Sequence, residues 1–120
     1  MTDQTKAIIR WLSDTVEIPV FQEPINSNQP QPYISLGSSV GDFSSAINQQ
    51  ITIWTRSDSS YEEAYRYTDL ISERLGDSGD ITKGNECILW IKKGSPFAQN
   101  KIDNEKTIRA VLINLEISMY

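Results

Sequence analysis

The chain has 120 residues, of which 38% are hydrophobic and 22% are charged, and it carries a formal net charge of −5 without any histidine. This composition excludes disordered and fibrous proteins and predicts that residues 1–120 form one globular domain. The absence of histidine excludes Ser-His-Asp and Cys-His catalysis and removes the usual zinc ligands.

No apolar run approaches the length of a membrane span, and the opening MTDQTKAIIRWLSD lacks the apolar core of a signal peptide. We therefore expect a protein without membrane contact that stays in the cytoplasm where it is made. The single cysteine, Cys87, lies in the apolar run CILWI, so we expect a buried thiol and no disulfide within the chain.

The N-terminal segment predicts a short amphipathic helix from Asp3 to Ser13, because its apolar residues recur at spacings of three and four. Asp3 is the expected N-cap. Residues 16–20 alternate as a strand, but Pro19 lacks an amide hydrogen and therefore places this strand at a sheet edge or breaks it. The proline-rich segment 26–32 is a turn.

Two further strands are expected before the second helix. Residues 33–37 alternate and lead into a glycine-containing loop at 37–46 that is long enough to protrude. Residues 47–56 alternate strongly and predict a long strand with one apolar face.

The polar cluster after Arg56 has two interpretations, a catalytic corner or the start of a helix. Apolar residues recur at helical spacing from Ser60 to Leu75, a stripe that includes Tyr61 and Tyr65 and ends before a glycine. Ser60 is followed three residues later by glutamate, which is a capping box. We favour the helix start, because a nucleophilic serine needs a base that the sequence does not offer.

The C-terminal part predicts a sheet made largely of hairpins. Residues 80–94 form one or two strands, the second from about Glu86 to Lys93, and a charged segment follows at 95–107. Residues 107–119 alternate throughout, as expected of a central strand. The predicted fold class is α+β, a mainly antiparallel sheet with two helices packed on one face, in the order α-β-β-β-α-β-β.

The sequence contains no cofactor motif. Its glycines lack the spacing of a phosphate-binding loop, and its acidic residues lack the spacing of a calcium loop, so we expect no cofactor, no metal and no catalytic residues. The basic residues near the C-terminus are weak evidence for nucleic-acid binding, because the chain as a whole is acidic.

One family shows the same layout. The segments INQQITIWTRSDSSYEEAYRYTDLISERL and CILWIKKGSPFAQNKIDNEKTIRAVLINLEISM combine a strand ending in Trp-Thr-Arg, a helix opening at SYEEAY, and a charged segment before the long terminal strand TIRAVLINLEIS. In this combination, over most of the chain, the sequence resembles the tail terminator or tail completion proteins of long-tailed (siphovirus-type) bacteriophages, of the minor tail protein U type.

The resemblance implies a structural protein rather than an enzyme. Members of such families form a hexameric ring on the tail tube, stop its polymerisation and provide the head-tail joining surface. The implied partners are other copies of the chain, the tail tube protein and the head-tail connector protein, with DNA passing through the ring without specific binding. The implied locations are the host cytoplasm during assembly and the virion tail afterwards.

A ring requires two different contact patches on each copy. The candidate pair is an acidic helix surface and a basic segment, and two phenylalanines in segments expected to be exposed either dock on a neighbour or pack on their own sheet. The candidate residues are Glu62, Asp69 and Glu73 for the acidic patch, Lys101, Lys106 and Arg109 for the basic one, and Phe43 and Phe97.

Three alternatives stay open. The first is a head-closure or neck connector protein of the same virion. The second is a small carboxylate-dependent cytoplasmic enzyme that pairs Asp58 with Glu62 or Glu63, which would need a concave pocket. The third is an adaptor that binds a peptide along an edge strand.

Overall fold

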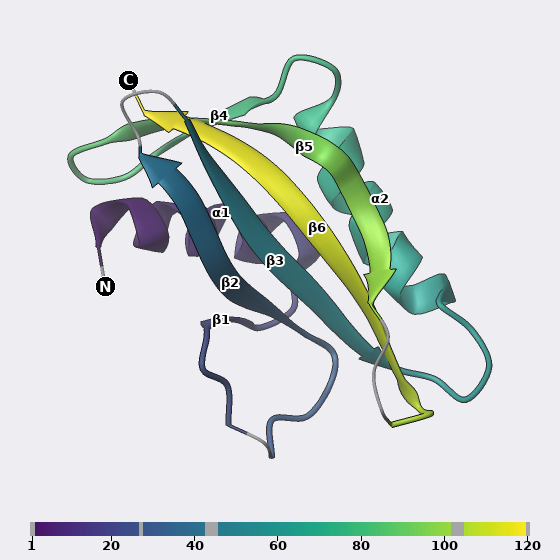
Figure 1. Cartoon of the computed structure of the whole chain (residues 1–120). Coiled ribbons are helices and arrows are strands. Elements are labelled where there is room, and N and C mark those ends of the chain that lie inside the picture. Colours follow the sequence, from purple (N-terminus) through teal and green to yellow (C-terminus); the bar gives the residue numbers. More distant parts are fainter. Residues whose placement is uncertain (1, 27, 43–45, 102–104, 120) are drawn as a thin grey trace.

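Two helices and six strands make up the part of the chain that the computed structural model describes, which is residues 2–26, 28–42, 46–101 and 105–119. Both helices lie behind a single sheet in the view of Figure 1. This confirms the predicted α+β class and element order, and residues 80–94 take the two-strand alternative. The elements are α1 (Asp3–Val16), β1 (Val20–Gln22), β2 (Tyr33–Asp42), β3 (Ala46–Arg56), α2 (Glu62–Leu75), β4 (Asp80–Lys83), β5 (Ile88–Lys101) and β6 (Ile108–Met119).

The strands β3 and β6 form the centre of the sheet, whose order is β1-β2-β3-β6-β5-β4. They pair without interruption from Ile47 opposite Ile117 to Arg56 opposite Ile108. All neighbouring strands are antiparallel except β1 and β2. The expected central position of the last strand is confirmed, and so is the edge position of the strand that follows Pro19.

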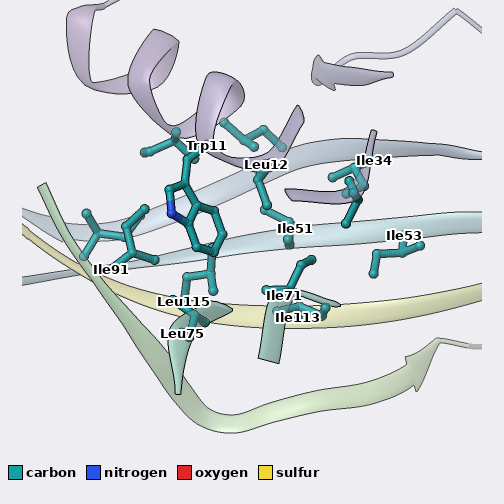
Figure 2. Close-up of a cluster of buried hydrophobic side chains, with 14 of the residues drawn as sticks. Trp11, Leu12, Ile34, Ile51, Ile53, Ile71, Leu75, Ile91, Ile113 and Leu115 are labelled. Atoms are coloured by element: carbon teal, nitrogen blue, oxygen red, sulfur yellow. The ribbon is translucent and has the colours of Figure 1, made fainter. Parts of the chain in front are cut away.

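The core lies between the sheet and the two helices. Ile51 and Ile113 pair across the β3–β6 ladder, and neither side chain is exposed to solvent. Figure 2 shows Trp11 and Leu12 of α1 and Ile71 of α2 in the same cluster. Each such side chain stabilises the fold by about 1.5–3 kcal/mol through burial.

The first helix begins at Asp3, as the sequence predicted, but its N-cap is a different residue. The Thr2 hydroxyl accepts a hydrogen bond from the Thr5 backbone N–H at 3.1 Å, so Thr2 is the N-cap and the assignment of Asp3 was wrong. The Asp3 carboxylate instead accepts the backbone N–H groups of Asn85 and Glu86, each at 2.9 Å. The bonds from Glu86 and Asn85 lower the pKa of Asp3 and fix the β4–β5 turn to the start of α1.

The first helix also extends further than predicted. It continues to Val16 and ends at Glu17, which adopts the left-handed conformation with φ of 58° and donates its N–H to the Ser13 carbonyl. The strand predicted over 16–20 therefore starts only at Val20. Val16 is buried on the face of the helix that packs against the core. An apolar residue at this position is compatible with a strand as well as with a helix.

A network around Arg74 joins α1, α2 and β4. The Trp11 indole N–H donates to Asp80 Oδ2 at 2.8 Å, and Arg74 Nε donates to the same oxygen at 3.1 Å. Arg74 Nη1 also donates to the Trp11 carbonyl at 3.1 Å and to the Thr15 hydroxyl at 2.6 Å. The guanidinium lies 4.8 Å from the Trp11 ring centroid, a cation–π distance. These contacts fix the two helices relative to the edge of the sheet.

The prediction of a protruding loop at 37–46 was wrong over much of its length, and the first part of the charged segment at 95–107 is a strand. The strand β2 runs to Asp42 and β5 runs to Lys101, each with an irregular step in its pairing. Strand pairing uses backbone groups, so polar and glycine-containing segments can join when a long apolar strand offers its edge. Here β3 and β6 offer those edges.

The buried thiol is confirmed. Cys87 is a free cysteine that belongs to the hydrophobic core, and the residue is only 8% exposed. Burial raises its pKa, and the neighbouring Asp3 carboxylate raises it further.

The core assignment predicts a large difference between two adjacent residues of β6. Ile113 faces the helices and is fully buried, whereas Leu112 is half-buried on the opposite face of the sheet. We expect Ile113→Ala to lower the free energy of unfolding by about 2–5 kcal/mol, because it removes apolar contacts and leaves a cavity. Urea denaturation measures this, with Leu112→Ala as the matched control. Equal losses would contradict the assignment of the core to the helix side.

The Asp3 contact predicts an acid-dependent contribution to stability. Because folding lowers its pKa from the ordinary 3.8, the stabilisation is present above that pH and is lost as the pH falls through the folded value. We expect Asp3→Asn to reduce stability at neutral pH and to flatten the loss of stability in acid. Denaturant titrations over a pH series measure both effects. Parallel pH profiles of parent and variant would show that Asp3 makes no such contribution.

Candidate functional site

The polar residues after β3 form the turn that leads into α2. The Ser57 hydroxyl accepts hydrogen bonds from the backbone N–H groups of Ser59 at 3.3 Å and Ser60 at 3.2 Å. Such a serine-centred turn satisfies backbone donors before a helix begins. The cluster is therefore helix-start chemistry, as the sequence indicated, but Ser57 organises it.

The predicted capping box is not formed. The helix starts at Glu62 with Tyr61 at the N-cap position, and no side chain caps it. The Ser60 hydroxyl accepts only a long hydrogen bond of 3.4 Å from the Glu62 N–H. The Glu63 carboxylate accepts from the Tyr67 hydroxyl at 3.0 Å instead of returning to the cap. The two residues of the predicted box are therefore engaged elsewhere, Ser60 through its backbone N–H in the turn around Ser57 and Glu63 through Tyr67.

Arg56 ties the end of β3 to the turn before β6. Its Nη1 donates to Glu105 at 2.8 Å and to the Thr107 hydroxyl at 2.7 Å, and its Nε lies 3.4 Å from the Gln31 side-chain oxygen. The hydrogen bond from Thr107 and that from Arg56 lower the pKa of Glu105. Arg56 is thus engaged in holding two connecting segments.

A shallow hollow of about 360 Å³ lies beside this turn. Asp58 does not line it and offers its carbonyl oxygen to Arg109 at 3.2 Å, so the structure does not bring Asp58 together with a glutamate in this hollow. The pairing of Asp58 with Glu62 or Glu63, which the enzyme alternative requires, is therefore not found in this hollow. The hollow is lined by Arg56, Ser57, Ser60, Glu62, Glu63 and Arg66.

A larger hollow of about 610 Å³ runs along the outer face of α2, and we call it the α2 groove. Its apolar part contains the Tyr61 and Tyr65 rings, which stack with centroids 5.6 Å apart, and Leu70. The groove is lined by Ser60, Tyr61, Glu62, Tyr65, Arg66, Asp69, Leu70 and Glu73.

The apolar part of the groove was not foreseen. The predicted helix stripe placed Tyr65 toward the core, but Tyr65 is 45% exposed and Tyr67 is buried in its stead. Leu70 is 38% exposed. Because it falls outside the apolar spacing of the helix, Leu70 was the signal that could have indicated an exposed apolar patch.

The structure brings the three acidic candidates together. Glu62, Asp69 and Glu73 are all exposed and all line the α2 groove. Their spacing on the helix puts the three carboxylates in one row between Tyr65 and Leu70, and Arg66 is the basic residue of the lining. The groove therefore combines exposed apolar side chains with a row of acidic ones.

The three basic candidates do not form one patch. Lys101 pairs with Ala110 on the face of the sheet without helices, where its Nζ lies 4.8 Å from the Trp54 ring centroid. Arg109 lies on the helix side, 5.6 Å from the Tyr61 ring centroid. Lys106 is exposed in the turn before β6. A residue-by-residue reading of charge does not show on which face each side chain lies.

The two phenylalanine candidates differ in status. Phe97 packs partly against the core, and the Lys93 ammonium lies 5.4 Å from its ring centroid. Packing on its own sheet was one of the two alternatives for this residue. Phe43 lies outside the described residues.

Aromatic rings cover one side of the helix-free face. Phe21 and Tyr33 pack edge to face at 6.1 Å, and Tyr33 stacks on Trp54 at 6.2 Å. The Trp54 indole N–H donates to the Ser35 hydroxyl at 2.9 Å, and Ser35 is only 1% exposed. This covering lies over β1, β2 and β3 and does not reach β4.

Within the described ranges, no three histidine, cysteine, aspartate or glutamate side chains are grouped to hold a metal ion. Neither of the helices in those ranges is long and apolar enough to cross a membrane.

The fold is similar to that of a chain in a solved virion particle. A chain from the virion of a native gene transfer agent particle superposes with a TM-score of 0.66 at 15% identity, covering 90% of this chain and 83% of its own. A second solved structure, which carries no functional name, gives a TM-score of 0.57 at 14% identity and covers 98% of this chain and 91% of its own. No protein-family model and no curated protein matches the sequence. At these identities, the likeness shows a shared fold.

The turn into α2 predicts unequal roles for its serines. We expect Ser57→Ala to lower the free energy of unfolding by about 0.5–1.5 kcal/mol, because two backbone N–H groups lose their acceptor. Ser60→Ala should cost less, since its single bond is long. Thermal or urea unfolding of both variants measures the difference. A larger loss of stability for Ser60→Ala would contradict this assignment and would indicate that the capping box organises the turn.

Proposed function

We propose that this protein is a structural component of a phage-like virion that caps the tail tube as a ring, stops tube polymerisation and provides the head-tail joining surface. The observation that carries the proposal is the fold likeness to a chain of a virion particle over 90% of this chain. The resemblance of the segments around the second helix and the last two strands to tail terminator proteins adds support from the sequence.

In this proposal the partners are further copies of the chain in a hexameric ring, the tail tube protein and the head-tail connector protein. DNA passes through the ring without specific binding, a role that the net negative charge suits. The acidic row of the α2 groove, formed by Glu62, Asp69 and Glu73, is one side of the contact between copies. Lys101, Lys106 and Arg109 are candidates for the other side, together with Phe43 and Phe97 for contacts to neighbours or to the tube.

A head-closure or neck connector role is the second candidate, because the same fold likeness supports any joining protein of such a virion. The two roles differ in one property, which is control of tail length. A connector acts after the tail is complete, whereas a terminator acts while the tube still grows.

The terminator role predicts uncontrolled tail growth when the gene is deleted from its parent phage. We expect overlong tubes without heads, because nothing blocks the growing end, and normal tails when the gene is supplied in trans. Negative-stain electron microscopy of lysates measures the length distribution. Headless tails of normal length would overturn the terminator role in favour of the neck or head-closure alternative.

A further inference from the structure

The hairpin of β4 and β5 carries an apolar ridge that nothing in the described part of the chain covers. Ile81 pairs with Trp90 and Lys83 pairs with Ile88, so all four side chains lie on the helix-free face. Ile81 is 55% exposed and Ile88 is 39% exposed. Lys92 lies on the same face, with its Nζ 4.3 Å from the Trp90 ring centroid. We call these five residues the β4–β5 ridge.

The ridge belongs to a firmly held hairpin. The Asp3 carboxylate binds two backbone N–H groups of the turn, and Arg10 donates to the Lys83 carbonyl. The Trp90 indole N–H donates to the Ser78 carbonyl at 2.8 Å. A surface held in this way loses little conformational freedom when it binds, which favours association.

The ridge and the α2 groove have complementary properties. The groove has exposed apolar side chains at Tyr65 and Leu70 and a row of carboxylates, and the ridge has exposed isoleucines flanked by Lys83 and Lys92. They lie on opposite sides of the molecule, because the groove is on the outside of the helix layer and the ridge is on the sheet face without helices. One copy therefore cannot close this contact on itself.

We propose that the β4–β5 ridge of one copy docks into the α2 groove of a second copy of this chain. The contact is heterologous, since it joins two different patches, and it repeats from copy to copy. This proposal rests on the ring assembly of the proposed function, and it identifies which part of a neighbouring copy occupies the groove. Arg109 and Lys101 are less suited to this role, because they lie on opposite faces of the sheet and therefore do not form one basic patch.

Mixing two defective variants tests the contact. The ridge variant carries Ile81→Glu and Ile88→Glu, the groove variant carries Leu70→Glu, and Val40→Glu is the control, because Val40 is 69% exposed outside both patches. At millimolar protein, sedimentation velocity should show association of the parent and the control, weakened about tenfold or more in each variant. An equimolar mixture of the two variants should regain complexes of two copies and no larger ones.

Carbodiimide crosslinking with mass spectrometry identifies the residues in contact. We expect crosslinks from Lys83 or Lys92 to Asp69 or Glu73, formed between copies, as mixed isotope labels show. Absence of association at millimolar protein, crosslinks from Lys101 or Lys106 in their place, or a mixture that stays monomeric would each overturn the proposal.

Tail lengths separate this inference from the proposed function. If the mixed variants regain two-copy complexes but deletion of the gene leaves tail length normal, the contact stands and the terminator role fails. If deletion gives overlong tails but mixing restores nothing, the terminator role stands and this contact fails.

Discussion

The pairing of β3 with β6 is the constraint on which the other elements depend. Ile51 and Ile113 meet at its centre, and the apolar side chains of both strands make the floor on which the two helices pack. The neighbouring strands β2 and β5 add Ile34, Leu36, Leu89 and Ile91 to this floor, and both are held by hydrogen bonds to the central pair. The network of Arg74, Trp11 and Asp80 then fixes the helices against the sheet edge. Removal of the central pair would leave no surface against which the helices could bury their apolar faces.

Apolar spacing in the sequence was sufficient to predict the helices and the central strand, and Pro19 indicated the edge strand that follows it. Prediction from apolar spacing failed where a segment joins the sheet through backbone hydrogen bonds and not through apolar side chains. Residues 37–42 and 95–101 contain few apolar side chains, yet they extend β2 and β5 because their neighbours in the sheet are long. The caps failed for a related reason, since Thr2 and Asp3 are both good N-cap residues and only tertiary contacts decide between them. The Asp3 carboxylate is taken by a turn more than eighty positions away.

The sequence was sufficient to predict which charged residues gather at the candidate site. It was not sufficient to predict on which face of the sheet each basic side chain lies. Three acidic residues at helical spacing had to share one side of α2, and the structure places all three around one groove. Lys101 and Arg109 are separated because the register of β5 against β6 sends them to opposite faces of the sheet. Register depends on irregular steps in pairing, which polar segments do not reveal. The exposed positions of Tyr65 and Ile81 follow from the same three-dimensional arrangement.

The placement of groove and ridge on opposite layers of the fold has a consequence for the size of an assembly. A copy that uses one patch still presents the other, so the contact itself does not limit an assembly to two copies. The rotation from one copy to the next sets the number of copies in a closed ring, because a ring closes when the rotations complete a full turn. That rotation is set by how the helix layer is oriented on the sheet. The number of subunits would then be a property of the monomer's internal packing.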